Sequence, residues 1–150
     1  DVLHHHGRTP SDHVLGLVGG GGAARSTASA WAELGGRIHQ LPSRRMFEDV
    51  PYMDAMTSDA PDVIVDFDNK DVLDAEVLLL RSVYEPMDGT VDERAAAITG
   101  GVLDGRWLLV AQHLACWRLL WAPERAQDLP SLGMLLTQLL EAESLLATYA

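Results

Sequence analysis

The 150-residue chain is poor in cysteine and in cations. Cys116 is its only cysteine, so an internal disulfide is excluded, and the apolar neighbours of Cys116 indicate a buried, unreactive thiol. Lys70 is the only lysine, and 11 Lys and Arg residues stand against 22 Asp and Glu residues, which gives a formal net charge of −11. Binding to nucleic acids or to anionic membrane surfaces depends on cationic side chains. The composition therefore argues against both kinds of partner.

The chain also lacks a long apolar run. Its most apolar window, residues 107–122, is interrupted by Gln112, His113 and Arg118, and it is shorter than the ~20 residues that a membrane-spanning helix needs. The opening residues show no apolar run before a small-residue cleavage site, so no secretory signal peptide is predicted. We therefore expect a cytoplasmic protein or a component of a soluble assembly.

Apolar residues make up 47% of the chain, which is enough for a hydrophobic core, and the length is typical of a single domain. Residues 1–60 are expected to form an irregular arm, in which the run Gly19 to Gly22 acts as a flexible joint. This run lacks the Lys-Ser/Thr ending of a phosphate loop, and we do not interpret it as the spaced glycine pattern of a dinucleotide fold. Residues 71–150 are rich in Leu and Ala and are expected to form a helical bundle.

The predicted fold is thus mainly α, with a C-terminal bundle of three to four helices after an irregular arm that contains at most one or two short strands. A strand is predicted at Val63 to Phe67, and His13 to Val18 is either its partner strand or one helical turn, the other possible partner being a second chain. Apolar spacing and capping residues predict the helices at residues 23–34, 46–56, 71–84, 90–99, 104–122 and 131–149.

The predicted helix at residues 104–122 carries a long apolar stripe. Its members repeat at intervals of three and four residues: Trp107, Val110, Leu114, Trp117 and Trp121. Because apolar residues also cover most of its other sides, we expect this helix to be the most buried element.

The last predicted helix has more apolar surface than one packing face needs. It can pack on two parts of its own chain, or it can form an oligomer interface. The candidate interface residues are Leu132, Leu135, Leu136, Leu139 and Leu146 of this helix, together with Leu15, Leu17 and Trp31 of the arm.

The segment Val63-Ile64-Val65-Asp66-Phe67-Asp68-Asn69 resembles the first motif of haloacid-dehalogenase-like phosphatases. The resemblance implies a Mg²⁺-dependent enzyme in which Asp66 is the nucleophile and Asp68 is the acid/base. It covers these seven residues only, and the lysine that the family needs downstream is missing, because no lysine follows Lys70. We therefore expect both aspartates to have a structural role.

No other group of residues predicts a catalytic site, a metal site or a cofactor. His4, His5 and His6 are adjacent on a terminus and, with His13, do not offer the paired spacing of a zinc site. The acidic residues around Asp66 and Asp68 lack the turn glycine and final glutamate of a calcium loop.

The sequence therefore favours a non-enzymatic role as an assembly component or adaptor that binds protein partners in a homo- or hetero-oligomer. Two alternatives remain open. One is an acidic inhibitor or immunity-type protein that covers a basic partner. The other is the small Mg²⁺-dependent phosphatase-like enzyme that uses Asp66 and Asp68.

Overall fold

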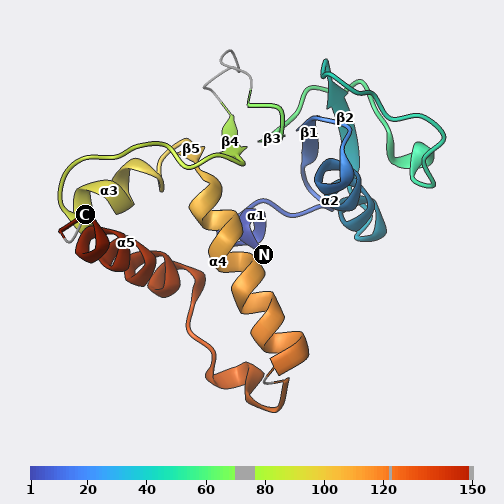
Figure 1. The fold of residues 1–150 in the computed structure, drawn as a ribbon. Helices are drawn as coiled ribbons and strands as arrows, with labels where there is room; N and C mark the ends of the chain where they lie inside the picture. The colour runs from blue at the N-terminus through green and yellow to red at the C-terminus, as the bar shows by residue number, and fades with distance from the viewer. Residues whose placement is uncertain (70–76, 122, 149–150) are drawn as a thin grey trace.

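A computed structural model describes residues 1–69, 77–121 and 123–148 of the chain. Figure 1 shows strands and helices that alternate along most of the sequence. The elements are α1 (Val2–His5), β1 (Val14–Val18), α2 (Gly22–Glu33), β2 (Arg37–Leu41), η1 (Met53–Ala55), β3 (Val63–Asp66), β4 (Leu78–Arg81), α3 (Val91–Ala97), β5 (Val102–Leu103), α4 (Gly105–Cys116), η2 (Trp117–Trp121), η3 (Pro123–Asp128) and α5 (Leu132–Thr148).

The centre of the fold is a five-stranded parallel sheet with the strand order β2-β1-β3-β4-β5. Leu15 of β1 lies between Ile38 of β2 and Val63 of β3, so β1 pairs on both of its edges. The protein therefore has an α/β fold of the Rossmann type, with helices packed on a parallel sheet. The prediction of a mainly α fold with a helical bundle was wrong.

Burial on both faces of the sheet explains part of this error. Every residue of β1 and β3 is buried, so these strands are continuous apolar runs without the alternation of a half-exposed strand. The Leu-rich β4, whose two central residues are buried and whose end residues are half-buried, also lacks this alternation, and it lies where the sequence predicted a helix at residues 71–84. The prediction is wrong for residues 77–84, none of which is helical, while residues 71–76 lie outside the described part of the chain.

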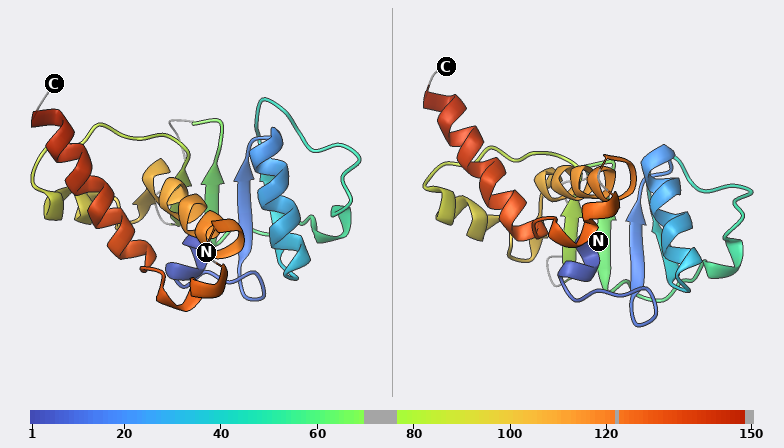
Figure 2. Two further views of the ribbon diagram at one scale, coloured as in Figure 1. Left: turned by 60° about the horizontal axis from the view of Figure 1, so that its bottom comes forward. Right: turned by 90° about the horizontal axis from the view of Figure 1, so that it is seen from below.

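Helices α2 and α4 cover the same face of the sheet (Figure 2). Leu15 and Leu17 of β1 belong to one hydrophobic core with Trp31 of α2 and Trp107 of α4. Residues 1–60 thus supply two strands and a helix to the central core. The expectation that they form an irregular arm was wrong.

Several predicted helices are confirmed. Helix α2 ends beside Gly35, whose φ of 81° is the left-handed conformation that favours glycine. Thr90 and Glu93 form the predicted capping box of α3, and Asp104 caps α4 by accepting a hydrogen bond from the Arg106 amide. The helix predicted at residues 46–56 is reduced to the single turn η1.

The apolar stripe of α4 is buried only at its beginning. Trp107, Val110 and Leu114 are almost fully buried, whereas Trp117 is 40% exposed and Trp121 is 65% exposed. The α-helix ends at Cys116 and continues as the π-helical turn η2. The prediction that this helix is the most buried element was wrong, because every residue of β1 and β3 is buried whereas only the first half of the stripe is. Within the described residues, no helix is long and apolar enough to cross a membrane.

Candidate functional site

The strand order reverses direction between β1 and β3. From β1 the chain moves outward to β2, then returns to the other side of β1 to form β3, β4 and β5. In open α/β sheets such a switch point leaves a crevice at the carboxyl ends of the two strands, and ligands bind there. In this protein the switch point lies between Gly19 after β1 and Phe67 after β3, and the Phe67 amide donates a hydrogen bond to the Val18 carbonyl.

The glycine run lies directly at this crevice, because it ends β1 and begins α2. Gly19 has a φ of 124°, which a residue with a side chain rarely adopts. Gly21 is open, since a Cβ placed there would meet no atom within 4 Å. Ala24 is 1% exposed and lies against Gly19, with 3.5 Å between its Cβ and the position of a Cβ at Gly19. Gly19, Gly21 and Ala24 therefore occupy the three positions of the G-x-G-x-x-G/A pattern between a strand and a helix.

The first turn of α2 faces the same space. Its N-cap is Gly21, which has no side chain to accept the amide hydrogens of the first turn. Unpaired amides and the helix dipole together attract anions at such a terminus. The turn, the open Gly21 and the start of α2 together form an open backbone cradle.

The loop after β2 packs directly on the glycine run. A Cβ at Gly20 would overlap the backbone carbonyl oxygen of Arg45, so only glycine allows this contact. The side-chain nitrogen Nε2 of Gln40 donates to the backbone carbonyls of Gly19 at 3.2 Å and Arg45 at 3.4 Å. The guanidinium of Arg25, in the first part of α2, donates to the Gly20 carbonyl at 3.1 Å. These contacts place the exposed Arg44 and Arg45 beside the cradle.

Asp66 and Asp68 stand at the end of β3, and each binds backbone amides. The Asp66 carboxylate is fully buried and accepts hydrogen bonds from the amides of Asp68 at 3.0 Å and Asn69 at 2.9 Å. Asp68 accepts one from the Arg44 amide at 2.9 Å. The two carboxylates thus hold the loops after β3 and β2 through backbone amides.

The loops after β3, β4 and β5 continue the same edge. The Ser82 hydroxyl donates to the Asn69 side-chain oxygen at 3.3 Å, and the Gly105 amide donates to the Val83 carbonyl at 2.7 Å. A Cβ at Gly105 would lie 2.7 Å from the Tyr84 ring, so the start of α4 approaches this loop very closely. The carboxyl edge of the sheet is therefore one row of connected loops from Gly19 to Gly105.

A cluster of four charged side chains supports the far end of this row. Arg94 of α3 and Arg106 of α4 both bind Glu143 of α5, and Arg106 also binds Asp104. Burial alone would lower the pKa of Arg106, but hydrogen bonds and charge attraction from Glu143 and Asp104 outweigh burial and raise the pKa. Two arginines and two carboxylates thus neutralise each other where helices α3, α4 and α5 meet.

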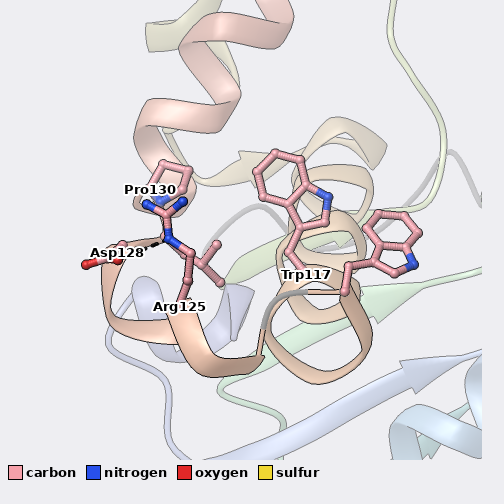
Figure 3. A pocket seen from close by; sticks show the side chains of 6 residues that line it. Trp117, Arg125, Asp128 and Pro130 are labelled. Atoms are coloured by element: carbon pink, nitrogen blue, oxygen red, sulfur yellow. Dashed lines mark hydrogen bonds and ion pairs between the residues drawn. The ribbon is translucent and has the colours of Figure 1, made fainter.

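Two apolar hollows lie away from the carboxyl edge. The first, of about 350 Å³, is lined by Trp117 and Trp121 at the opposite end of α4 from Asp104, and Figure 3 shows Arg125 and Asp128 paired on its rim. The second, of about 520 Å³, lies between α2 and α4 over Val65 and Leu80 of the sheet.

The residues proposed for an interface occupy different environments. Leu15, Leu17, Trp31, Leu132 and Leu136 are buried in the core, Leu135 and Leu139 pack against it, and Leu146 is 71% exposed. The histidines His5 and His6, at the end of α1, pack against α4, and the centroid of the His6 ring lies 4.7 Å from that of the Trp107 ring. Among the described residues, no group of three or more His, Cys, Asp or Glu side chains is placed to hold a metal ion.

Comparison with protein-family models and with curated proteins finds no match to the sequence. Among solved structures, the chain is similar to shikimate dehydrogenase 1 from Peptoclostridium difficile, with a TM-score of 0.56, 12% identity, 95% of this chain covered and 59% of that chain. It also matches the shikimate dehydrogenase of Mycobacterium tuberculosis, with a TM-score of 0.49, 19% identity, and coverage of 94% and 60%. The chain therefore spans about three fifths of the length of these structures, and the first similarity supports the Rossmann-like fold.

Proposed function

We propose that this chain is a dinucleotide-binding domain that holds a nicotinamide dinucleotide at the switch point between β1 and β3. The observation that carries the proposal is the glycine run. Gly19 makes the turn, Gly21 leaves the backbone open to a pyrophosphate, and Ala24 lets α2 pack closely on β1. The start of α2 then offers its amides to the same pyrophosphate.

We further propose that the preferred dinucleotide is NADP. The adenosine ribose binds at the end of the second strand, where an acidic residue selects the free 2′-hydroxyl of NAD and an arginine accommodates the 2′-phosphate of NADP. In this chain β2 ends at Leu41 and is followed by Arg44 and Arg45, with no acidic residue before Glu48. These arginines also supply local positive charge in a chain whose net charge is −11.

A nicotinamide dinucleotide supplies a hydride donor or acceptor at its nicotinamide ring. The similar structure from Peptoclostridium difficile is that of a dehydrogenase. We propose that this chain serves an oxidoreductase in the same way, by binding and orienting the dinucleotide. The chain spans 59% of that structure, so the proposal concerns the dinucleotide-binding part of such an enzyme.

Binding of NADP⁺ and NADPH to the purified chain, measured by calorimetry or nucleotide fluorescence, tests the proposal. We expect wild-type protein to bind and the Gly21→Leu variant to lose binding, because the new side chain fills the space that the pyrophosphate requires. Gly133→Ala is the matched control, since Gly133 is also open but lies in α5. Equal dinucleotide affinity in wild type and Gly21→Leu would contradict the proposal, and so would a wild-type chain that binds no dinucleotide.

A second candidate function follows from the exposed turn η2, which continues α4. Four large apolar side chains are exposed within one turn, namely Trp117, Leu119, Leu120 and Trp121. Exposed apolar patches of this kind are typical of protein–protein contacts, which favours the protein-binding role predicted from the sequence. Native mass measurement of wild type and of Leu120→Ser is the test, and a monomer in both cases would count against self-association through this turn.

A further inference from the structure

We infer that Glu143 of α5 is a positioning residue for the nicotinamide half of the dinucleotide. It acts through Arg106, which holds the loop after β4 in place as a wall of the crevice. This inference rests on the proposed function and adds to it a residue that lies on the last helix, far along the sequence from the glycine run.

The Glu143 carboxylate forms ion pairs with two arginines, Arg94 and Arg106. Its two carboxylate oxygens accept hydrogen bonds from the Arg106 Nε at 3.0 and 3.1 Å, and one of them also binds a terminal nitrogen of Arg94. The side chain of Glu143 is 27% exposed, whereas those of Arg106 and Arg94 are only 8% and 9% exposed. Because the arginines are nearly buried, their orientation depends on this carboxylate.

Arg106 then transmits this orientation to the loop after β4. Its terminal nitrogen Nη1 donates to the Glu85 backbone carbonyl at 3.1 Å. Its guanidinium lies over the Tyr84 ring, 5.3 Å from the centroid. The same nitrogen binds the Asp104 carboxylate, which caps α4. One guanidinium therefore contacts the loop after β4, the start of α4 and, through Glu143, α5.

The topology places this wall on the nicotinamide side of the crevice. Arg44 and Arg45 mark the adenosine side at the end of β2, and the start of α2 marks the pyrophosphate. A dinucleotide that lies across the switch point must extend its second half over the loops that follow β3, β4 and β5. The loop that carries Tyr84 is in that row, and it is joined to the loop after β3 through Ser82 and Asn69.

The expected effect of Glu143→Gln is selective for one half of the ligand. Glutamine keeps the size of the side chain but removes the charge, so Arg106 loses a charge-assisted partner and the loop after β4 loosens. We expect the Kd of NADP⁺ to rise about 5-fold or more, which corresponds to roughly 1 kcal/mol. The Kd of 2′-phospho-ADP-ribose, which is NADP⁺ without its nicotinamide, should stay within about 2-fold, because its contacts involve only the glycine run and the β2 loop.

Calorimetric titration of both ligands into wild type, Glu143→Gln and Glu141→Gln decides the matter. Glu141 lies exposed on the same helix, so Glu141→Gln is the matched control and should change neither Kd. If Glu143→Gln does not fold, Glu143→Asp, which keeps the charge but shortens its reach to Arg106, replaces it with the same expectation.

The outcomes separate the two proposals. If Glu143→Gln raises the Kd of NADP⁺ but not that of 2′-phospho-ADP-ribose, the inference is supported. If Glu143→Gln raises both Kd values equally, or changes neither, the inference is overturned. The proposal that the chain binds a dinucleotide then still stands. A wild-type chain that binds neither ligand overturns the proposed function and this inference with it, whereas a wild-type chain that binds 2′-phospho-ADP-ribose and NADP⁺ with equal affinity overturns the inference alone.

Discussion

Arg44 and Arg45 contact the rest of the crevice through their backbones. The Arg44 amide binds Asp68, and the Arg45 carbonyl lies on Gly20 and accepts a hydrogen bond from Gln40. Replacing both side chains with alanine therefore leaves these contacts in place and removes only positive charge. This separation makes the pair well suited to a test of dinucleotide preference.

We expect the double variant Arg44→Ala/Arg45→Ala to raise the Kd of NADP⁺ by about 10-fold or more. The reason is that each charge-assisted hydrogen bond to a phosphate contributes roughly 1.5–3 kcal/mol. The affinity for NAD⁺, which lacks the 2′-phosphate, should change little. The ratio of the two Kd values is the measurement, and a ratio equal to that of wild type would contradict the assignment of these arginines.

The tryptophans of the α4 stripe provide a second contrast between single residues. Trp107 is 1% exposed and donates from its ring nitrogen to the Ile98 carbonyl at 2.6 Å, whereas Trp117 is 40% exposed. Trp107→Ala should reduce the free energy of unfolding by ~3–5 kcal/mol, and Trp117→Ala by clearly less. Urea unfolding of both variants measures the difference. Equal losses of stability would contradict the difference in burial between Trp107 and Trp117.

Between elements, the loop after β2 approaches the glycine run very closely. Gly20→Ala would force the Arg45 carbonyl away, and because that atom belongs to the backbone, the whole loop must shift. We expect a loss of roughly 1–3 kcal/mol in stability together with weaker selection of NADP⁺ over NAD⁺. Thermal unfolding and the Kd ratio are the readouts, with Gly133→Ala as the control, since a Cβ at Gly133 meets no atom within 4 Å and Gly133 lies in α5, outside the proposed site.

The success of sequence-based prediction also differed among elements. The capping box at Thr90 and the cap at Asp104 are local signals, and both were located correctly. The strand β4 was assigned to a helix because a short apolar run is compatible with either when both faces are buried. The pairing of β3 with β1 was one of two options that the sequence left open, and the structure confirms it.

The candidate site was missed for a related reason. A run of four glycines contains the spacing of Gly19 and Gly21, with Ala24 at the third position, but it looks like a low-complexity joint. The signal that distinguishes the two interpretations is the strand at Val14–Val18 directly before it and the helix directly after it. The contact between Glu143 and Arg106 had no local signal, because helix packing alone brings these residues together.

For the molecule as a whole, the N-terminal segment closes over α4 through two histidines. The rings of His5 and His6 lie 5.3 and 4.7 Å from the Trp107 ring between centroids. Burial, and after it the charge of His5, lower the pKa of His6 below its ordinary value of 6.5. Below that value the unfolded chain binds the proton more readily than the folded chain, so stability falls as the pH decreases.

We therefore expect the free energy of unfolding to decrease from pH 7 to pH 5, with part of the slope removed in His6→Gln. Chemical unfolding of both proteins across this range is the measurement. An unchanged slope in the variant would mean that other groups account for the pH dependence.

The central position of β1 also affects how the chain folds during its synthesis. Leu15 and Leu17 leave the ribosome before the strands that pair with β1 and before the helices that cover it. The segment around Trp107, which completes this core, follows Leu15 by 92 residues. At ~5–20 residues per second that interval is on the order of ten seconds, during which the apolar face of β1 lacks its final cover. A nascent chain of this fold therefore exposes the apolar face of β1 for a prolonged period before its own helices cover that face.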